Sequence, residues 1–141
     1  MALELGCLAK EPVATLCDRR NRLRPQTAAP GEIAKVSKQL RSLLRELRNR
    51  FKALYGPRLV RLVLFGSYAR GDAEPGSDID VLVVLDGPVR PGEEIARTGG
   101  IASGISLDNN VVISCTFISA DGFERDESPL MINVRREGVP V

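Results

Sequence analysis

The 141-residue chain contains no histidine and no tryptophan, and its only cysteines are Cys7, Cys17 and Cys115. Without histidine, Ser-His and Cys-His nucleophile arrangements cannot form, and the commonest general base is missing. Cysteines that are odd in number and widely spaced support neither a zinc site nor a disulfide framework. Any chemistry must therefore use carboxylates, hydroxyls, lysines, arginines or a bound metal ion.

Long apolar runs are also missing. No stretch approaches the roughly 18 to 20 apolar residues that cross a bilayer, and the first residues do not resemble a secretory signal. We therefore expect a cytoplasmic protein with no membrane partner. A hydrophobic fraction of 43% with 27% charged residues is ordinary for a folded protein, and the length fits one domain.

Aromatic residues are few, whereas charge is abundant and unevenly spread. Four phenylalanines and two tyrosines offer few surfaces on which single-stranded bases could stack. Residues 32–61 carry nine basic and two acidic side chains, but residues 62–141 carry six and thirteen. The basic face from Lys35 to Lys52 is either a solvated helix surface or a surface that binds a partner or nucleic acid. We favour a protein partner, and nucleic acid stays possible.

The first 30 residues show no sustained periodicity and contain three prolines and an arginine cluster at 19–24. They predict an N-terminal extension that is mobile, or alternatively an arm that binds nucleic acid. The folded domain is expected to span residues 31–141. From Glu32 to Leu54, apolar residues recur at spacings of three and four, which predicts a long helix that Gly56-Pro57 ends.

Three apolar runs predict buried strands, at residues 59–65, 79–85 and 111–118. A short helix is expected after the first strand. A helix over 93–107, weakened by three glycines, is expected after the second. Near the end of the sequence, Ser128-Pro129 and Gly138 are typical of the start and the end of a last helix.

The residues that can carry chemistry lie between the first two predicted strands. Gly66 and Ser67 stand where a strand turns into a helix, and the free amides of a helix start with a serine hydroxyl can hold phosphate. Asp78 and Asp80, one residue apart at the head of a strand, point to the same face. Two carboxylates on one face favour a cation, and Mg²⁺ binds through one or two carboxylates plus substrate phosphates.

Each half of this pattern also has an ordinary structural interpretation, as a turn and as a solvated strand start. The four residues at a fixed offset, however, would occur by chance in about one in a thousand chains of this length. The combination therefore predicts one site for a magnesium nucleoside triphosphate.

The spacing Gly-Ser, ten residues, Asp-x-Asp resembles the signature of the polymerase-beta-like nucleotidyltransferase superfamily. The longer motif, Phe-Gly-Ser-x-Ala-Arg-Gly followed by Ser-Asp-Ile-Asp, resembles the minimal, single-domain branch of this superfamily. The resemblance extends over Glu32 to Val141. The resemblance implies an α/β (α+β) fold, with a small mixed β-sheet and helices packed on one face. It also implies transfer of a nucleoside monophosphate, most often AMP from ATP, to an acceptor hydroxyl.

Carried over by position, the resemblance assigns Gly66 and Ser67 to nucleotide binding and the two aspartates to Mg²⁺ and catalysis. Arg70 either approaches the phosphates or pairs with Asp72 or Glu74. Active relatives place a third carboxylate on the neighbouring strand, and the position that we align with it is Asn110, which carries no charge and cannot act as a base. Either catalysis is impaired, or Asp108, two residues earlier and of the same strand parity, substitutes.

The acceptor is not encoded in any motif. The minimal branch of the superfamily is often an antitoxin paired with a helical toxin of the HEPN type, and some members adenylylate a toxin tyrosine. The resemblance thus implies a protein partner, or else a homo-oligomer that completes the site. A catalytically weakened nucleotide- or partner-binding module and an enzyme acting on RNA are the alternatives.

Overall fold

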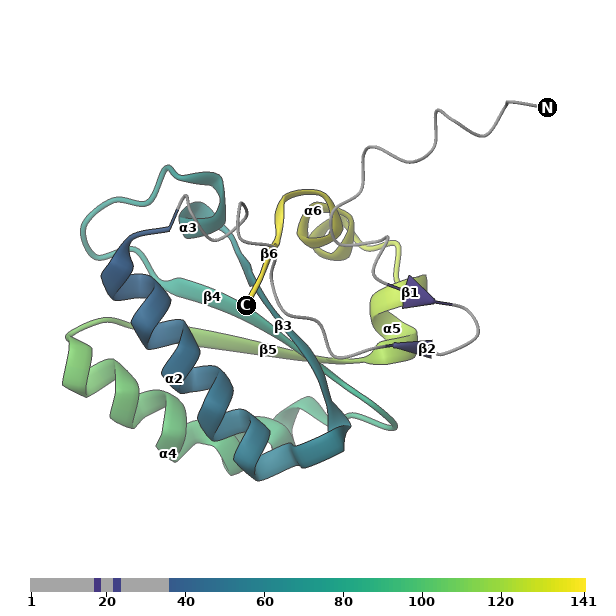
Figure 1. Cartoon of the computed structure of the whole chain (residues 1–141). Coiled ribbons are helices and arrows are strands. Elements are labelled where there is room, and N and C mark those ends of the chain that lie inside the picture. Colours follow the sequence, from purple (N-terminus) through teal and green to yellow (C-terminus); the bar gives the residue numbers. More distant parts are fainter. Residues whose placement is uncertain (1–16, 19–21, 24–35) are drawn as a thin grey trace.

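The computed structural model describes residues 17–18, 22–23 and 36–141 (Figure 1). Strands β1 (Cys17–Asp18) and β2 (Arg22–Leu23) form an antiparallel pair of two residues each. Apart from this pair, the expected N-terminal extension lies outside the described residues, as does the expected start of the first long helix before residue 36.

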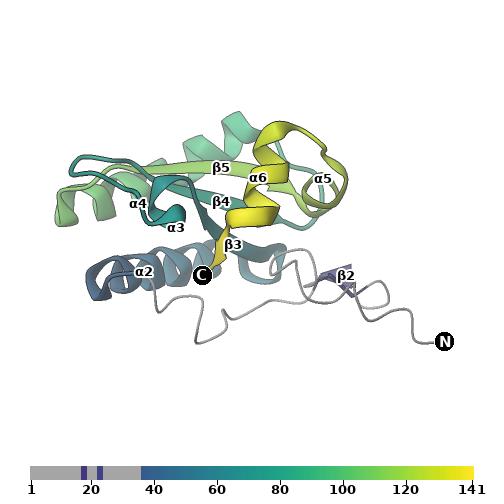
Figure 2. The same cartoon turned by 90° about the horizontal axis from the view of Figure 1, so that it is seen from above.

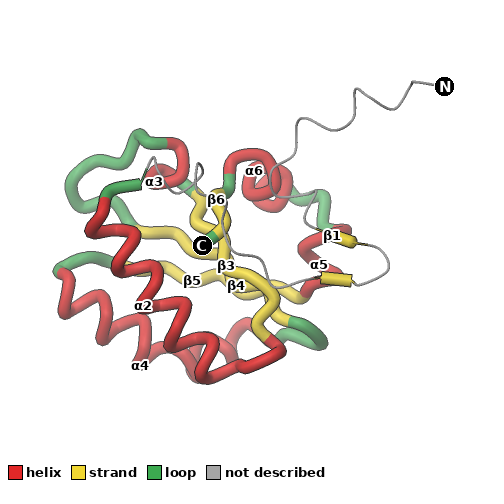
Figure 3. The backbone as a smooth tube through the Cα atoms, in the orientation of Figure 1, coloured by secondary structure: helices red, strands yellow, loops and turns green. Residues whose placement is uncertain are grey.

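A mixed four-stranded sheet forms the centre of the domain, in the order β5-β4-β3-β6 (Figure 3). Strands β3 (Leu59–Phe65) and β4 (Ile79–Leu85) are antiparallel and have the predicted bounds. Strand β5 (Ile113–Ser119) runs parallel to β4, and the short β6 (Val139–Pro140) runs antiparallel to β3. The expected mixed-sheet α/β class is confirmed, and β6 is an addition that the sequence did not reveal.

Helices α2 (Lys38–Tyr55) and α4 (Pro91–Asn109) cover one face of the sheet. Helix α2 begins at Ser37, whose hydroxyl accepts from the Leu40 amide at 3.2 Å, and ends at the predicted glycine, Gly56, before the 3₁₀ turn η3 (Gly56–Arg58). Its predicted apolar stripe is buried up to Phe51, but Leu54 at its end is 42% exposed. The buried residues of α2 are Leu40, Leu43, Leu44, Leu47, Phe51 and Tyr55. None of the helices in the described part of the chain is long and apolar enough to cross a membrane.

The second face of the sheet is also partly covered, by α5 (Ala120–Arg125) and α6 (Pro129–Glu137) (Figure 2). The resemblance implied helices packed on one face, and α5 and α6 are an addition to that prediction. The difference arises because the strands are apolar on both faces, as is usual for buried central strands. Leu82 and Val84 pack against Phe123, Met131 and Val134 from these two helices. Ser128 caps α6 and Gly138 ends it, as predicted.

A buried carboxylate joins the ends of α2, η3 and α4. The Glu94 side chain is 4% exposed, and it accepts from the Tyr55 hydroxyl at 2.6 Å and from Arg58 Nη1 at 3.0 Å. Arg97 approaches it at 3.4 Å. Burial raises the pKa of Glu94, but the hydrogen bonds from Tyr55 and Arg58 and the two arginine charges outweigh it, so the pKa lies below the usual range.

Candidate functional site

The ends of β3 and β4 bring Gly66 and Asp80 into direct contact. Phe65 is opposite Asp80 in the antiparallel register, so the residue after Phe65 lies beside that carboxylate. Gly66 has φ +74°, and a Cβ atom at this position would lie 2.5 Å from Asp80 Oδ2. Only glycine fits here without displacing the carboxylate, both for its backbone conformation and for the available space.

Gly66 is followed by α3 (Ser67–Arg70), a single helical turn that ends at Gly71 in a left-handed conformation. The amides of Ala69 and Arg70 both donate to the Gly66 carbonyl. The amides of Ser67 and Tyr68, at the first two helical positions, are not used by the helix itself and can donate to a ligand. Ser67 is half-buried and adjoins the Gly66–Asp80 contact.

Asp80 and Asp78 flank Ile79, which is 1% exposed and belongs to the core under α2 and α4. Because side chains alternate along a strand, Asp80 shares the opposite face with Leu82 and Val84. Helices α5 and α6 pack over those two residues, whereas Asp80 is half-buried and Asp78 is exposed. The carboxylates therefore stand at an open end of this face.

The electrostatics of the pair favour a cation. Burial, followed by the negative charge of Asp78, raises the pKa of Asp80, and the Arg70 charge lowers it by a smaller amount. A nearby cation would remove both the repulsion and the cost of burying charge. Two close carboxylates beside a turn with free amides match Mg²⁺, which keeps few protein ligands and takes the rest from phosphate and water. The residues present therefore fit magnesium held jointly with a phosphate ligand.

Arg70 forms the ion pair that the sequence left as one of two possibilities. Its Nε lies 3.2 Å from Asp72 Oδ2, and both side chains are about half exposed. Such a surface pair is weak, so it does not prevent the guanidinium from turning to an anion.

The structure corrects the placement of the third carboxylate. Asn110 is not on a strand, because it ends helix α4 in a left-handed conformation with φ 53°. Asp108 lies in the last turn of α4 and is exposed, so the strand parity that linked it to the site does not apply. The residue opposite Asp80 on β5 is Ser114. The position of Ser114 was not predicted, because the alternation of side chains along a strand does not show which residue stands opposite Asp80 on the neighbouring strand.

No carboxylate therefore accompanies the pair on β5. In residues 36–141, as in the short strands described before them, no group of three or more His, Cys, Asp or Glu side chains is placed to hold a metal ion. A metal ion bound here would have two protein carboxylates, Asp78 and Asp80, with the exposed hydroxyl of Ser114 in the adjacent strand position.

The part of the sequence that forms this candidate site matches a known protein family. A family profile described as "Nucleotidyltransferase domain" matches residues 44–114, about half of the chain, including the whole β3–α3–β4 segment. The chain belongs to the nucleotidyltransferase domain family. Within this domain, the Gly66–Asp80 contact and the Asp78–Asp80 pair lie inside the matched region.

Three curated relatives of this nucleotidyltransferase domain come from Methanocaldococcus jannaschii, and each is named "Putative protein adenylyltransferase". One is 49% identical over 43 residues, which are 30% of this chain and 43% of the relative. The second is 45% identical over 47 residues, 33% of this chain and 32% of the relative. The third is 35% identical over 72 residues, 51% of this chain and 72% of the relative. The chain thus spans less than half of the first two relatives.

A solved structure described as "Crystal structure of the toxin-antitoxin with AMP-PNP" is also similar to this domain. The similarity covers 67% of this chain and 68% of that chain, with 21% sequence identity and a TM-score of 0.48.

Proposed function

We propose that this nucleotidyltransferase domain binds a magnesium nucleoside triphosphate and transfers its nucleoside monophosphate to a hydroxyl group of a protein partner. The observation that carries the proposal is the packing of Gly66 against the Asp80 carboxylate, with Asp78 and the start of α3 beside it. This packing supports the proposal because two carboxylates that could hold a cation and backbone amides that could donate to phosphate lie at one open end of the sheet.

In the proposed reaction, the acceptor oxygen forms a bond to the α-phosphorus of the nucleotide. The bond from that phosphorus to the bridging oxygen breaks, and pyrophosphate leaves with the electron pair, while the acceptor proton passes to solvent or to a base. Asp78 and Asp80 would hold Mg²⁺, which supplies neutralisation of phosphate charge when bound. The amides of Ser67 and Tyr68, the Ser67 hydroxyl and Arg70 would orient the phosphate chain.

ATP is the nucleotide that we propose, and a protein hydroxyl is the acceptor. The support is the shared name of the three archaeal relatives, which specifies both adenylate and protein. A helical toxin of the HEPN type, with this chain as its antitoxin in the cytoplasm, is the partner class implied by the motif resemblance. A second copy of the chain is the other partner to test.

A second candidate function is a catalytically weakened module that binds nucleotide or partner without efficient transfer. The observation in its favour is Ser114, which stands opposite Asp80 where a carboxylate could complete the site. A serine hydroxyl near neutral pH is a poor general base. The two functions share nucleotide binding and differ in turnover.

The test uses ATP labelled at the α-phosphate, Mg²⁺, and either a purified helical toxin of the HEPN type or total RNA. Label on the protein that disappears with Asp78→Asn and Asp80→Asn is the expected result. Asp86→Asn is the matched control, because Asp86 is exposed at the other end of β4. Asp108→Asn should also retain activity, since Asp108 is on a helix surface.

Titration calorimetry with ATP and Mg²⁺ separates the remaining outcomes. Heat of binding without label transfer would favour the weakened module. Label on RNA alone would refute the protein acceptor, and a folded protein that binds no nucleotide would refute the proposal as a whole.

A further inference from the structure

Strand β5 forms one edge of the central sheet, and within the described residues it pairs only with β4. The Ile79 amide donates to the Val112 carbonyl at 2.8 Å, and backbone groups alternate in direction along a strand. The even-numbered residues of β5 therefore direct their amides and carbonyls to β4, and the odd-numbered residues direct theirs outward. The outward amides of Cys115 and Phe117 have no strand beside them in the described part of the chain.

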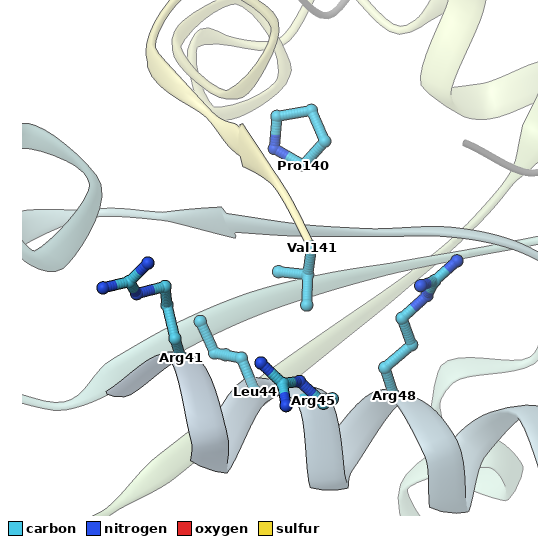
Figure 4. A pocket seen from close by; sticks show the side chains of 6 residues that line it. All are labelled: Arg41, Leu44, Arg45, Arg48, Pro140 and Val141. Carbon is cyan, nitrogen blue, oxygen red and sulfur yellow. The ribbon is translucent and has the colours of Figure 1, made fainter. Parts of the chain in front are cut away.

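The two edges of the sheet differ in the features that prevent edge-to-edge association. Proteins protect exposed edges with short strands, prolines, bulges or charged side chains. Strand β6, at the other edge, has two residues, one of them Pro140, and Figure 4 shows it beside Arg41 and Leu44 of α2. Strand β5 has seven residues, Ile-Ser-Cys-Thr-Phe-Ile-Ser, with no charge, no proline and no shift in its register with β4. The β5 edge is therefore open to another strand.

Helix α4 continues this edge on the face of the sheet that it covers. The Ser106 hydroxyl accepts from the outward amide of Ile113 at 3.2 Å, which shows which flank of α4 lies at the edge. Spacings of four, three and four residues place four uncharged residues on this flank, namely Ile95, Gly99, Ala102 and Ser106. Ile95 is 54% exposed, and Asp108 is the only charged residue in the sequence 98–119, although 27% of the whole chain is charged. An exposed surface with so little charge is typical of the centre of a protein interface.

These features favour a second copy of the chain as the partner at this edge. A twofold axis places identical elements opposite each other, so a charged strand or flank would repel its own copy. Strand β5 and the edge flank of α4 carry no charge and can pair with themselves. Antiparallel α4 helices can also bring the bulky Ile95 of each copy against the small Gly99 and Ala102 of the other. Nucleic acid is disfavoured, because residues 98–119 include no lysine or arginine.

We propose that two copies of the chain associate through this edge, with the two β5 strands antiparallel and the two α4 flanks packed together. The two sheets then form one continuous sheet, and the outward amides of Cys115 and Phe117 gain acceptors. Asp80 stands opposite Ser114 of β5, so each candidate site lies one strand away from the interface, and both sites lie on the same side of the joined sheet. Association of this kind needs no nucleotide, so the proposal is independent of the proposed function.

The first test is sedimentation equilibrium of the full chain without nucleotide, over a range of concentrations. The variant is Gly99→Gln, because a Cβ at Gly99 meets no atom within 4 Å in one copy, whereas a long side chain would separate the two helices. Gly100→Gln is the matched control. Its Cβ is equally unobstructed, but one residue is a rotation of about 100° around the helix, which places it away from the edge flank. Glutamine favours a helix more than glycine, so both variants should fold.

We expect the wild-type protein to form dimers whose dissociation constant rises about tenfold or more in Gly99→Gln, because an inserted side chain disrupts close packing. The dissociation constant of Gly100→Gln should change by less than about twofold. A wild-type protein that stays monomeric at every concentration would overturn the proposal. Equal losses in the two variants would also overturn it.

Amide hydrogen exchange, measured by NMR, tests the strand pairing itself. The amides of Cys115 and Phe117 should exchange slowly in the dimer and faster in Gly99→Gln, because only the dimer gives them acceptors. The amides of Ser114 and Thr116 face β4 and should be protected in both proteins, which makes them the internal control. Fast exchange of Cys115 and Phe117 in a dimer would place the interface elsewhere. Slow exchange of these two amides in a monomer would show that another part of the chain covers the edge, and either result would overturn the proposal.

Discussion

Two carboxylates withdrawn from solvent, Asp80 and Glu94, have opposite surroundings. Glu94 receives hydrogen bonds from Tyr55 and Arg58 and has two arginines nearby, and its pKa is lowered although it is almost fully buried. Asp80 is less buried, yet burial and the adjacent Asp78 raise its pKa. The chain itself stabilises the charge of Glu94, whereas the surroundings of Asp80 disfavour its charge. This difference distinguishes a structural carboxylate from one that is available for a ligand.

The largest effect is expected for Glu94→Ala. This change removes one member of a buried ionic group and leaves the Tyr55 hydroxyl and Arg58 Nη1 without the acceptor they share. The free energy of unfolding should therefore fall by about 3 kcal/mol. Urea denaturation measures it. Glu93→Ala is the control, because the Glu93 side chain is 61% exposed and pairs with an arginine that is 80% exposed. Equal losses for the two glutamates would contradict the role assigned to Glu94.

Gly66→Ala should reduce nucleotide binding far more than it reduces stability. Its left-handed φ predicts a loss of about 1 kcal/mol in stability, and the new Cβ would collide with Asp80 and abolish binding of ATP with Mg²⁺. Gly76→Ala introduces the same backbone strain at φ +89°, but no atom lies within 4 Å of the new Cβ. It should lose similar stability and keep its nucleotide affinity in calorimetry. If both variants bind nucleotide normally, the Gly66–Asp80 contact is not part of the site.

The pH dependence of stability should have opposite signs at the two carboxylates. The lowered pKa of Glu94 stabilises the fold above the ordinary carboxylate pKa of about 4, and this stabilisation is lost as the pH falls through the folded-state pKa. The raised pKa of Asp80 means that its ionisation costs stability as the pH rises through the folded-state value. In urea denaturation without metal, we therefore expect two opposite trends as the pH rises from low to neutral. The free energy of unfolding of Asp80→Asn should increase relative to the wild type, and that of Glu94→Gln should decrease relative to it. Parallel curves for the two variants would contradict this assignment.

The smallest change in stability is expected for Ser114→Asp. A third carboxylate opposite Asp80 should lower the stability of the metal-free protein by a few tenths of a kcal/mol, through like-charge repulsion across the strands. The same charge should tighten Mn²⁺ binding by about tenfold, measured by titration calorimetry. Ser114→Asn, which has nearly the same shape as aspartate without the charge, should do neither. If Ser114→Asp gains metal affinity but no turnover, the missing carboxylate is not what limits the reaction.

Local patterns in the sequence predicted much of the fold. The apolar runs predicted the bounds of β3 and β4, Gly56 predicted the end of α2, and Ser128 and Gly138 predicted the ends of α6. The Ser37 cap of α2 was not predicted. The start of β5 was misjudged because Asn110 adopts a left-handed conformation, which ends α4 two residues beyond the expected position and delays the strand. Asparagine adopts this conformation more often than other non-glycine residues and can end a helix, but the strand-like alternation that follows Asn110 favoured a strand there.

Features that depend on distant contacts were not predictable. Strand β6 is a strand only because Val139 and Pro140 pair with the open edge of β3. The Tyr55–Glu94 hydrogen bond joins residues 39 positions apart, and no motif connects them. Gly66, Ser67, Asp78 and Asp80 were predicted as a cluster because they lie within one hairpin. Ser114, which belongs to another strand, required the β4–β5 register.

The β3–α3–β4 hairpin, with its antiparallel register from Leu59↔Leu85 to Phe65↔Asp80, has a consequence for how the protein acquires its site. Strands β3 and β4 are neighbours in the sequence, so bringing them together closes only a short loop and costs little entropy. Local contacts of this kind speed folding. The candidate site residues therefore come together as soon as this one hairpin forms, before α4 has to dock and bury Glu94. A nascent chain would thus bring Gly66, Ser67, Asp78 and Asp80 together from one continuous stretch of sequence.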